Sequence, residues 1–259
     1  LVTQTLSDLS FREYLAFHHG LYFDKITLPE LLKNVLTVSM ELAKQFKPLP
    51  LFKDYLRNGY FPFTRNVEEE SISPRLIRII NTVLEIDLAY IQDYNASNIA
   101  KIKKLLGVIA SVAPFEPNIS KIAEKLQLGR NTVNAYLYHL KDAHILRLMS
   151  KKPKSISILQ KPDKIYFENT SFAYALQNDR EIGSVRETFF INQLENAGHT
   201  IQLSNKGDFL VNEKWIFEVG CKNKKEQQIR GVKNAFLALD DIETGFSNHI
   251  PLWLFGFLY

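Results

Sequence analysis

Cysteine is almost absent from the sequence: its 259 residues include one, Cys221, so no disulfide can form within the chain. Structural disulfides belong to oxidising compartments, and their absence predicts a protein of the reducing cytoplasm. No apolar run reaches the length of a membrane span or of a signal peptide, so no membrane partner is expected. The first residue is Leu1 rather than Met, which indicates a piece of a longer chain.

Charge of either sign is nearly balanced, since 32 Lys and Arg against 28 Asp and Glu leave a formal net charge of +4. This mild excess is compatible with nucleic acid binding but does not indicate it. The six histidines have no cysteine partners and no H-x-x-x-H spacing, which argues against a zinc site. A hydrophobic content of 46% and a length of 259 residues are typical of two or three globular domains.

Residues 118–147 predict two short helices, a turn between them, and the start of a strand. Apolar residues recur at helical spacing on one face of each helix, at Ile122, Ala123, Leu126, Val133, Leu137 and Leu140. This pattern is typical of a helix-turn-helix. Its turn holds Gln127 where glycine is usual, and Gly129 is the expected N-cap of the second helix.

The second helix is expected to direct toward solvent residue types that hydrogen-bond to base edges and phosphates: Arg130, Asn131, Thr132, Asn134 and Tyr138. Residues 145–149 and 155–159 predict two strands around Lys151 and Lys152, which would form the basic wing of a winged helix. A winged helix that only packs between two domains, without DNA contact, is the alternative.

The first 114 residues predict helices without a strand, which together form a helical bundle. Ser10 and Glu13 have the spacing of a capping box at the start of the first helix. Residues 28–46 are expected to form one helix. Ser73 and Pro74 are expected to start a long helix as its N-cap and first residue.

Residues 161–259 predict a mixed domain with the element order αβββαβ. A strand at 162–169 and a short helix are expected to precede it. In chain order, the expected elements are a helix at 184–196, strands at 200–203, 207–211 and 215–219, a helix at 225–239 and a strand at 250–258.

Three segments together resemble one known architecture: LSDLSFREYL near the start, YNASNIAKIKKLLGVIASVAPFEPNISKIAEKLQLGRNTVNAYLYHL in the centre, and RETFFINQL, KGDFL, FEVG and IPLWLFGFLY near the end. They are similar to the C-terminal part of bacterial AAA+ family ATPases that carry a C-terminal domain of unknown function. The resemblance implies that the helical bundle is the lid of a P-loop core that would precede Leu1. That core would be a partner of this chain, and the resemblance leaves a homo-oligomer open.

The P-loop sequence G-x-x-x-x-G-K-[ST] does not occur, so this chain alone is not expected to hydrolyse ATP. Any ATP would be held by the preceding core. Gly59 and Pro62 resemble the turn that such lids place near the nucleotide base. As an alternative, Gly59 only stops a helix and Pro62 only bends the chain.

The αβββαβ order also resembles the restriction-endonuclease-like fold with its PD-(D/E)xK motif. Asp208 and Glu218 are expected on neighbouring strands, where they would bind Mg²⁺, and Glu187 on the preceding helix would be the third acid. Glu187 has an alternative role in a capping box with Ser184.

The sequence departs from this motif at the lysine, since Gly220 stands two residues after Glu218. The nearest lysines are Lys222 and Lys224, and a bulge at Gly220 would return Lys222 to the acids. A degenerate domain that keeps its acids for structural hydrogen bonds is the alternative to an active nuclease.

The sequence therefore predicts an α+β protein with a lid-like bundle at residues 1–114, a winged helix-turn-helix at 115–160 and a nuclease-like domain at 161–259. The expected function is a DNA-binding or signalling module of an AAA+ ATPase. A metal-dependent nuclease using Asp208, Glu218 and Lys222 is the first alternative, and a protein-interaction module without DNA contact is the second.

Overall fold

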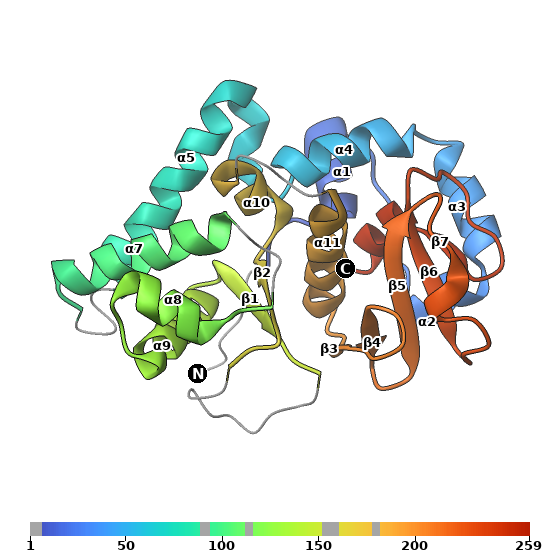
Figure 1. Cartoon of the computed structure of the whole chain (residues 1–259). Helices are drawn as coiled ribbons and strands as arrows, with labels where there is room; N and C mark the ends of the chain where they lie inside the picture. Colours follow the sequence, from blue (N-terminus) through green and yellow to red (C-terminus); the bar gives the residue numbers. More distant parts are fainter. Residues whose placement is uncertain (1–6, 89–93, 112–115, 152–160, 178–181) are drawn as a thin grey trace, which may run out of the picture. The chain divides into compact units, whose positions relative to one another are not determined.

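The computed structural model describes residues 7–88, 94–111, 116–151, 161–177 and 182–259 (Figure 1). It confirms a mixed α and β protein with a five-stranded sheet. The chain divides into two compact units, one made of Leu1–Val67 with Phe189–Tyr259 and the other of Glu68–Thr188. The domain boundaries expected near residues 114 and 160 both fall inside the second unit.

The helices of the first unit come from both ends of the chain: α1 Phe11–His19, α2 Leu28–Lys33, α3 Val35–Ala43, α4 Pro48–Asn58, η1 Pro62–Asn66 and the second half of α11 Ile182–Asn196. The Ser10 capping box is confirmed, because the Ser10 hydroxyl accepts from the Glu13 amide at 3.1 Å and the Glu13 carboxylate accepts from the Ser10 amide at 2.9 Å. The single helix expected at residues 28–46 is wrong. Asn34 leaves the helical backbone region, with φ −121° and ψ 28°, and separates α2 from α3.

The sheet of the first unit has the order β3 Ile201–Leu203, β4 Phe209–Val211, β5 Trp215–Cys221, β6 Ala235–Asp240 and β7 His249–Pro251. The β3–β4 and β4–β5 pairs are antiparallel, whereas the β5–β6 and β6–β7 pairs are parallel. Phe190 of α11 packs against Phe209, Phe217 and Phe255, with ring centroids 4.8 to 5.5 Å apart.

Two sequence predictions for this sheet are wrong. The helix expected at 225–239 is the short 3₁₀ turn η3 Glu226–Gln228 followed by strand β6, so the order αβββαβ fails at its second helix. The apolar run of β6 is paired on both edges and ends in buried residues, and a buried parallel strand lacks the alternation that separates strand from helix. The strand expected at 250–258 is mostly the 3₁₀ helix η4 Leu252–Phe257.

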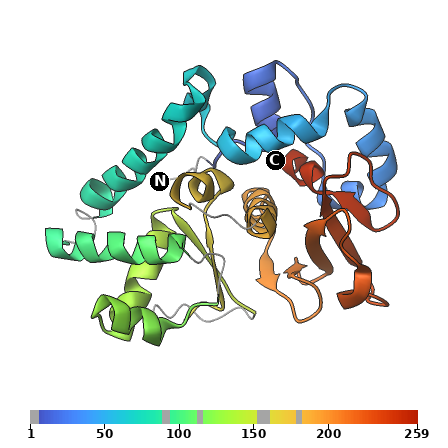
Figure 2. The ribbon, with the colours of Figure 1, turned by 45° about the horizontal axis from the view of Figure 1, so that its top comes forward.

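The described residues of the second unit form helices, including the first half of α11, and one pair of strands. Its elements are α5 Glu69–Thr82, the π-helix η2 Val83–Leu88, α7 Ala96–Ala110, α8 Ile119–Leu126, α9 Arg130–Asp142, β1 Leu146–Met149, β2 Lys164–Phe167 and α10 Thr170–Leu176. Helix α7 contacts α8, α8 contacts α9, and α9 contacts β1. Figures 1 and 2 show this unit in two orientations, with α10 in contact with both α5 and α7.

One expectation for the second unit needs correction. Helix α5 begins at Glu69, so Ser73 and Pro74 lie inside it rather than at its start. Ile72 is buried on the same face as Leu76 and Ile80, and this packing holds an extra turn ahead of the proline. Strand β1 pairs with β2 in antiparallel register, Leu146 opposite Phe167. The strand expected at 155–159 lies outside the described residues.

Within the described residues no helix is long and apolar enough to cross a membrane.

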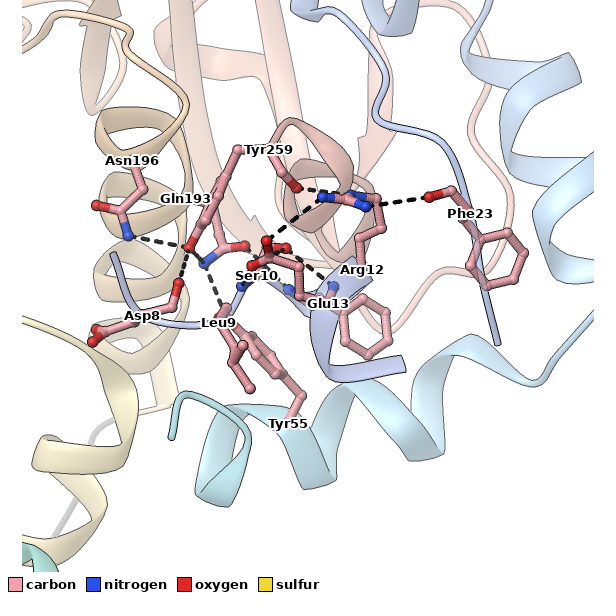
Figure 3. A network of polar contacts seen from close by, with 11 residues as sticks. Asp8, Leu9, Ser10, Arg12, Glu13, Phe23, Tyr55, Gln193, Asn196 and Tyr259 are labelled. Carbon is pink, nitrogen blue, oxygen red and sulfur yellow. Dashed lines mark hydrogen bonds and ion pairs between the residues drawn. The ribbon is translucent and has the colours of Figure 1, made fainter. Parts of the chain in front are cut away.

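A buried polar network joins α1, α4, α11 and the last residue of the first unit (Figure 3). Gln193 is fully buried, and its amide nitrogen lies 3.0 Å from the Tyr55 hydroxyl and 3.3 Å from the Tyr259 hydroxyl. The two phenols donate in turn to the Leu9 carbonyl at 2.7 Å and the Asp8 carbonyl at 3.0 Å. Burial raises the pKa of Tyr55 well above its usual value, so this phenol stays protonated and remains a donor.

Replacing Gln193 with Leu is expected to lower the free energy of unfolding by roughly 1–3 kcal/mol, because buried groups at Tyr55 and Tyr259 lose a partner. Urea unfolding followed by tryptophan fluorescence would measure the loss, since both tryptophans, Trp215 and Trp253, lie in this unit. The exposed Gln45→Leu variant is the matched control and should remain near wild type. Equal stabilities of the two variants would show that the network contributes nothing.

Candidate functional site

Helices α8 and α9 meet in a tight turn, as the sequence predicts. Gln127 ends α8 in the left-handed conformation with φ 54°, so it occupies the backbone state for which glycine is usual. The amides of Gln127 and Leu128 bond back to the Glu124 and Ala123 carbonyls at 3.1 and 2.9 Å. Gly129 is the N-cap of α9. Because glycine has no side chain, the cap residue makes no side-chain hydrogen bond to the first backbone amides of α9.

The residues predicted to face outward from α9 divide into three groups. Arg130 and Asn131 are exposed, and Thr132 and Tyr138 are half-buried. Asn134 is only 5% exposed, so its prediction as a DNA contact is wrong. It lies beside Val133 and one turn before Leu137 in the sequence, two residues with no exposed surface. Sequence reasoning overlooked the exposed lysines Lys121 and Lys125 on α8 and Lys141 on α9, which the polar face of each helix could have indicated.

The structure describes one of the two lysines that were predicted for the wing after β1. Lys151 is exposed, and its backbone amide donates to the Asp163 carboxylate at 2.9 Å, which holds the chain just after β1. Lys152 lies outside the described residues. Arg147 of β1 is not available to a partner, because its guanidinium is buried and lies 2.7 Å from the Glu168 carboxylate.

The sheet of the first unit brings Asp208 and Glu218 to neighbouring positions. Asp208 precedes β4, and its amide donates to the Phe217 carbonyl at 2.8 Å. Its carboxylate accepts from the Val219 amide at 2.8 Å. Glu218 lies between these two partners on β5, and its side chain has no exposed surface. Asp208 therefore binds the strand that carries Glu218.

Lys224, not Lys222, reaches the buried acid. The Lys224 ammonium lies 2.9 Å from the Glu218 carboxylate, whereas Lys222 is exposed, so the prediction of Lys222 is wrong. A β-carbon added at Gly220 would lie 2.7 to 2.8 Å from three side-chain carbons of Lys224. The stem of Lys224 thus fills the space that a side chain at position 220 would need. The glycine at the position where the motif has lysine was the sequence signal that a different lysine reaches the acid.

Glu187 belongs to a different cluster, in the second unit. Its carboxylate accepts from the Lys164 ammonium at 2.7 Å and from the Tyr166 hydroxyl at 2.5 Å, and both donors are on β2. The alternative capping box with Ser184 is also wrong, because α11 begins at Ile182 and Ser184 lies inside it. A long-range ion pair therefore accounts for this carboxylate.

These acids do not fit a Mg²⁺ site as they are placed. Magnesium needs near-octahedral oxygen ligands and keeps several of its waters, whereas Glu218 exposes no oxygen and is already neutralised by Lys224. In the part of the chain that the structure describes, no three His, Cys, Asp or Glu side chains are grouped to hold a metal. As placed, Asp208 binds the backbone of β5 and Glu218 pairs with Lys224.

The turn suggested for nucleotide contact is packed against aromatic rings. Gly59 ends α4, and a β-carbon there would lie 2.2 Å from a ring atom of Tyr55 and 2.9 Å from one of Tyr14. Pro62 begins η1, and Tyr60 between them is fully buried. Close packing therefore requires a glycine at position 59.

The model of one protein family, a domain of unknown function (DUF8612), matches residues 49–182, which is just over half of the chain. No curated protein and no solved structure matches the chain.

Proposed function

Since the chain belongs to the DUF8612 family, whose description assigns no activity, we propose a function from its own residues: binding of duplex DNA through α9 and the start of the loop after β1. Arg130 and Lys151 would contact phosphates, and Asn131 would contact a base edge. The exposure of Arg130 and Asn131 at the first turn of α9 is the observation that carries this proposal.

The order of elements in the second unit supports the proposal. Three helices, α7, α8 and α9, pack in sequence and are followed by the antiparallel pair β1 and β2, which is the order of a winged helix. In that fold the third helix enters the major groove with its first residues toward the bases. Here the first residues of α9 are the polar and exposed ones, while Val133 and Leu137 are buried.

Charge also favours a polyanion as partner. The described residues of α8 and α9 carry the lysines Lys121, Lys125 and Lys141 in addition to Arg130, against Glu124 and Asp142. Lysine and arginine contacts to phosphate give affinity by releasing counterions from DNA. In this proposal the sheet of the first unit is a degenerate nuclease-like fold with a structural acid pair. The AAA+ resemblance of the sequence would add an ATP-dependent core that acts on the module.

The test is binding of a fluorescent duplex by the whole chain at several salt concentrations. Removing Arg130 and Lys151 together, as Arg130→Ala/Lys151→Ala, should lower the slope of log K against log salt by about two, one for each phosphate contact. Lys33→Ala, an exposed lysine at the end of α2 in the other unit, should leave both slope and affinity near wild type.

Two outcomes would contradict the proposal. If the wild type shows no salt-dependent binding to duplex DNA, the alternative of a protein-interaction module is favoured. If binding occurs but the double variant behaves as Lys33→Ala does, DNA contacts a surface other than α9.

A further inference from the structure

Two hollows of the second unit meet at one lysine. The first, about 440 Å³ in volume, lies among residues of α5, η2, α7 and α10. The second, about 420 Å³, lies between η2 and the first half of α7. Lys103 lines both of them. Each volume is in the range of small-molecule sites, which is roughly 300–1,000 Å³.

The walls of the larger hollow combine apolar side chains with the polar side chains of Asn81, Lys103 and Ser111. Ile80, Leu84 and Leu106 have at most 5% of their surface exposed and form its base. Gly107 lies on the α7 wall, and a β-carbon added there would have no atom within 4 Å. The space beside Gly107 is therefore open, and a ligand can approach the helix backbone closely.

The polar groups at the junction are one cation and one anion. Lys103 forms an ion pair with Glu85 of the π-helix η2, and its side chain is 33% exposed against 55% for Glu85. Glu85 can turn into water at small cost, because a half-exposed ion pair contributes little stability. Lys103 is more enclosed and stays between the two hollows. π-Helical turns inside α-helices are frequent at functional sites, and here the turn supplies both Leu84 and Glu85.

We propose that this pair of hollows, which we call the Lys103 groove, binds an amphipathic organic acid. The carboxylate of the ligand replaces that of Glu85 on the Lys103 ammonium. Its apolar chain lies along Ile77 and Leu176 and fills the open space beside Gly107. This inference is independent of DNA binding, because none of the groove residues is on α8, α9 or the loop after β1.

The experiment is calorimetric titration of the whole chain with decanoate, and with 1-decanol as a probe of equal chain length without charge. Lys103→Met should weaken decanoate about threefold, as expected for the loss of one partly exposed ion pair, and leave decanol unchanged. Glu85→Gln should strengthen decanoate, because the competing carboxylate is gone. Gly107→Leu should abolish binding of both probes by filling the space beside α7.

A loss of binding must come from the groove and not from unfolding of the variant. Leucine is a better helix former than glycine and its β-carbon meets no atom at position 107, so Gly107→Leu should remain folded by circular dichroism. The proposal is overturned if decanoate does not bind the wild type, or if folded Gly107→Leu binds it equally well. It is also overturned if decanol and decanoate respond alike to Lys103→Met, because the ligand class would then not be an acid.

Discussion

Replacing Lys224 with Met is expected to lower the free energy of unfolding of the first unit by about 3–5 kcal/mol. Glu218 has no exposed side-chain surface, and Lys224 lies 2.9 Å from its carboxylate. A buried carboxylate that loses its cation still carries the full free-energy cost of its removal from water. Removing one partner of such a pair is therefore more destabilising than removing both. Urea unfolding followed by the fluorescence of Trp215 and Trp253 would measure the change, since both lie in this unit.

The neighbouring lysine provides the control, and the acid provides a rescue. Lys222 is exposed, so Lys222→Met should change stability by less than about 0.5 kcal/mol. Adding Glu218→Met to Lys224→Met should restore most of the loss, because no buried charge then remains. If Lys224→Met is as stable as Lys222→Met, the ion pair does not stabilise the sheet and Glu218 is free for another role.

Features set by neighbouring residues were predictable from the sequence. The Ser10 and Glu13 capping box, the helices α8 and α9 and the turn at Gln127 all follow from spacings within one or two helical turns. Such signals persist whatever the rest of the chain does, since the partners are three or four residues apart.

Features set by distant partners were not predictable. Strand β6 is apolar up to its last residue, Asp240, because strands lie on both sides of it, and this apolar run alone suits a buried helix equally well. The pairing of Glu187 with Lys164 and Tyr166 depends on the packing of β2 against α11. Lys224 replaced Lys222 because the stem of Lys224 occupies the space above Gly220, a contact that no spacing rule contains.

The inward position of Asn134 has a similar origin. Helical periodicity places position 134 near the edge of the apolar face of α9. Packing then determines whether the side chain at this position is buried or exposed. The buried neighbours Val133 and Leu137 carry it inward. Solvent exposure was therefore predicted correctly at the first turn of α9, at Arg130 and Asn131, where no apolar residue competes for the outer surface.

Replacing Arg147 with Met is expected to lower the free energy of unfolding of the second unit by about 3–5 kcal/mol. Arg147 is on β1, and its guanidinium donates to the backbone carbonyl of Glu168 at 3.1 Å and to the Glu168 carboxylate at 2.7 Å. Both side chains are nearly buried, with 9% and 12% of their surface exposed. The exposed His144, whose Nδ1 lies 3.5 Å from the same carboxylate, is screened by water and replaces the arginine poorly.

Hydrogen exchange of the β1 and β2 amides separates this effect from unfolding of the other unit. Protection of residues 146–149 and 164–167 should fall in Arg147→Met, because the pair joins the two strands at the end where Leu146 faces Phe167. Arg130→Met, on the exposed first turn of α9, should leave that protection unchanged and lower only DNA affinity. Arg147→Met/Glu168→Met should recover stability, since both charges are then absent from the interior. If instead the double variant is as unstable as Arg147→Met alone, the loss comes from the packing of the arginine stem, and the buried charge of Glu168 is not its cause.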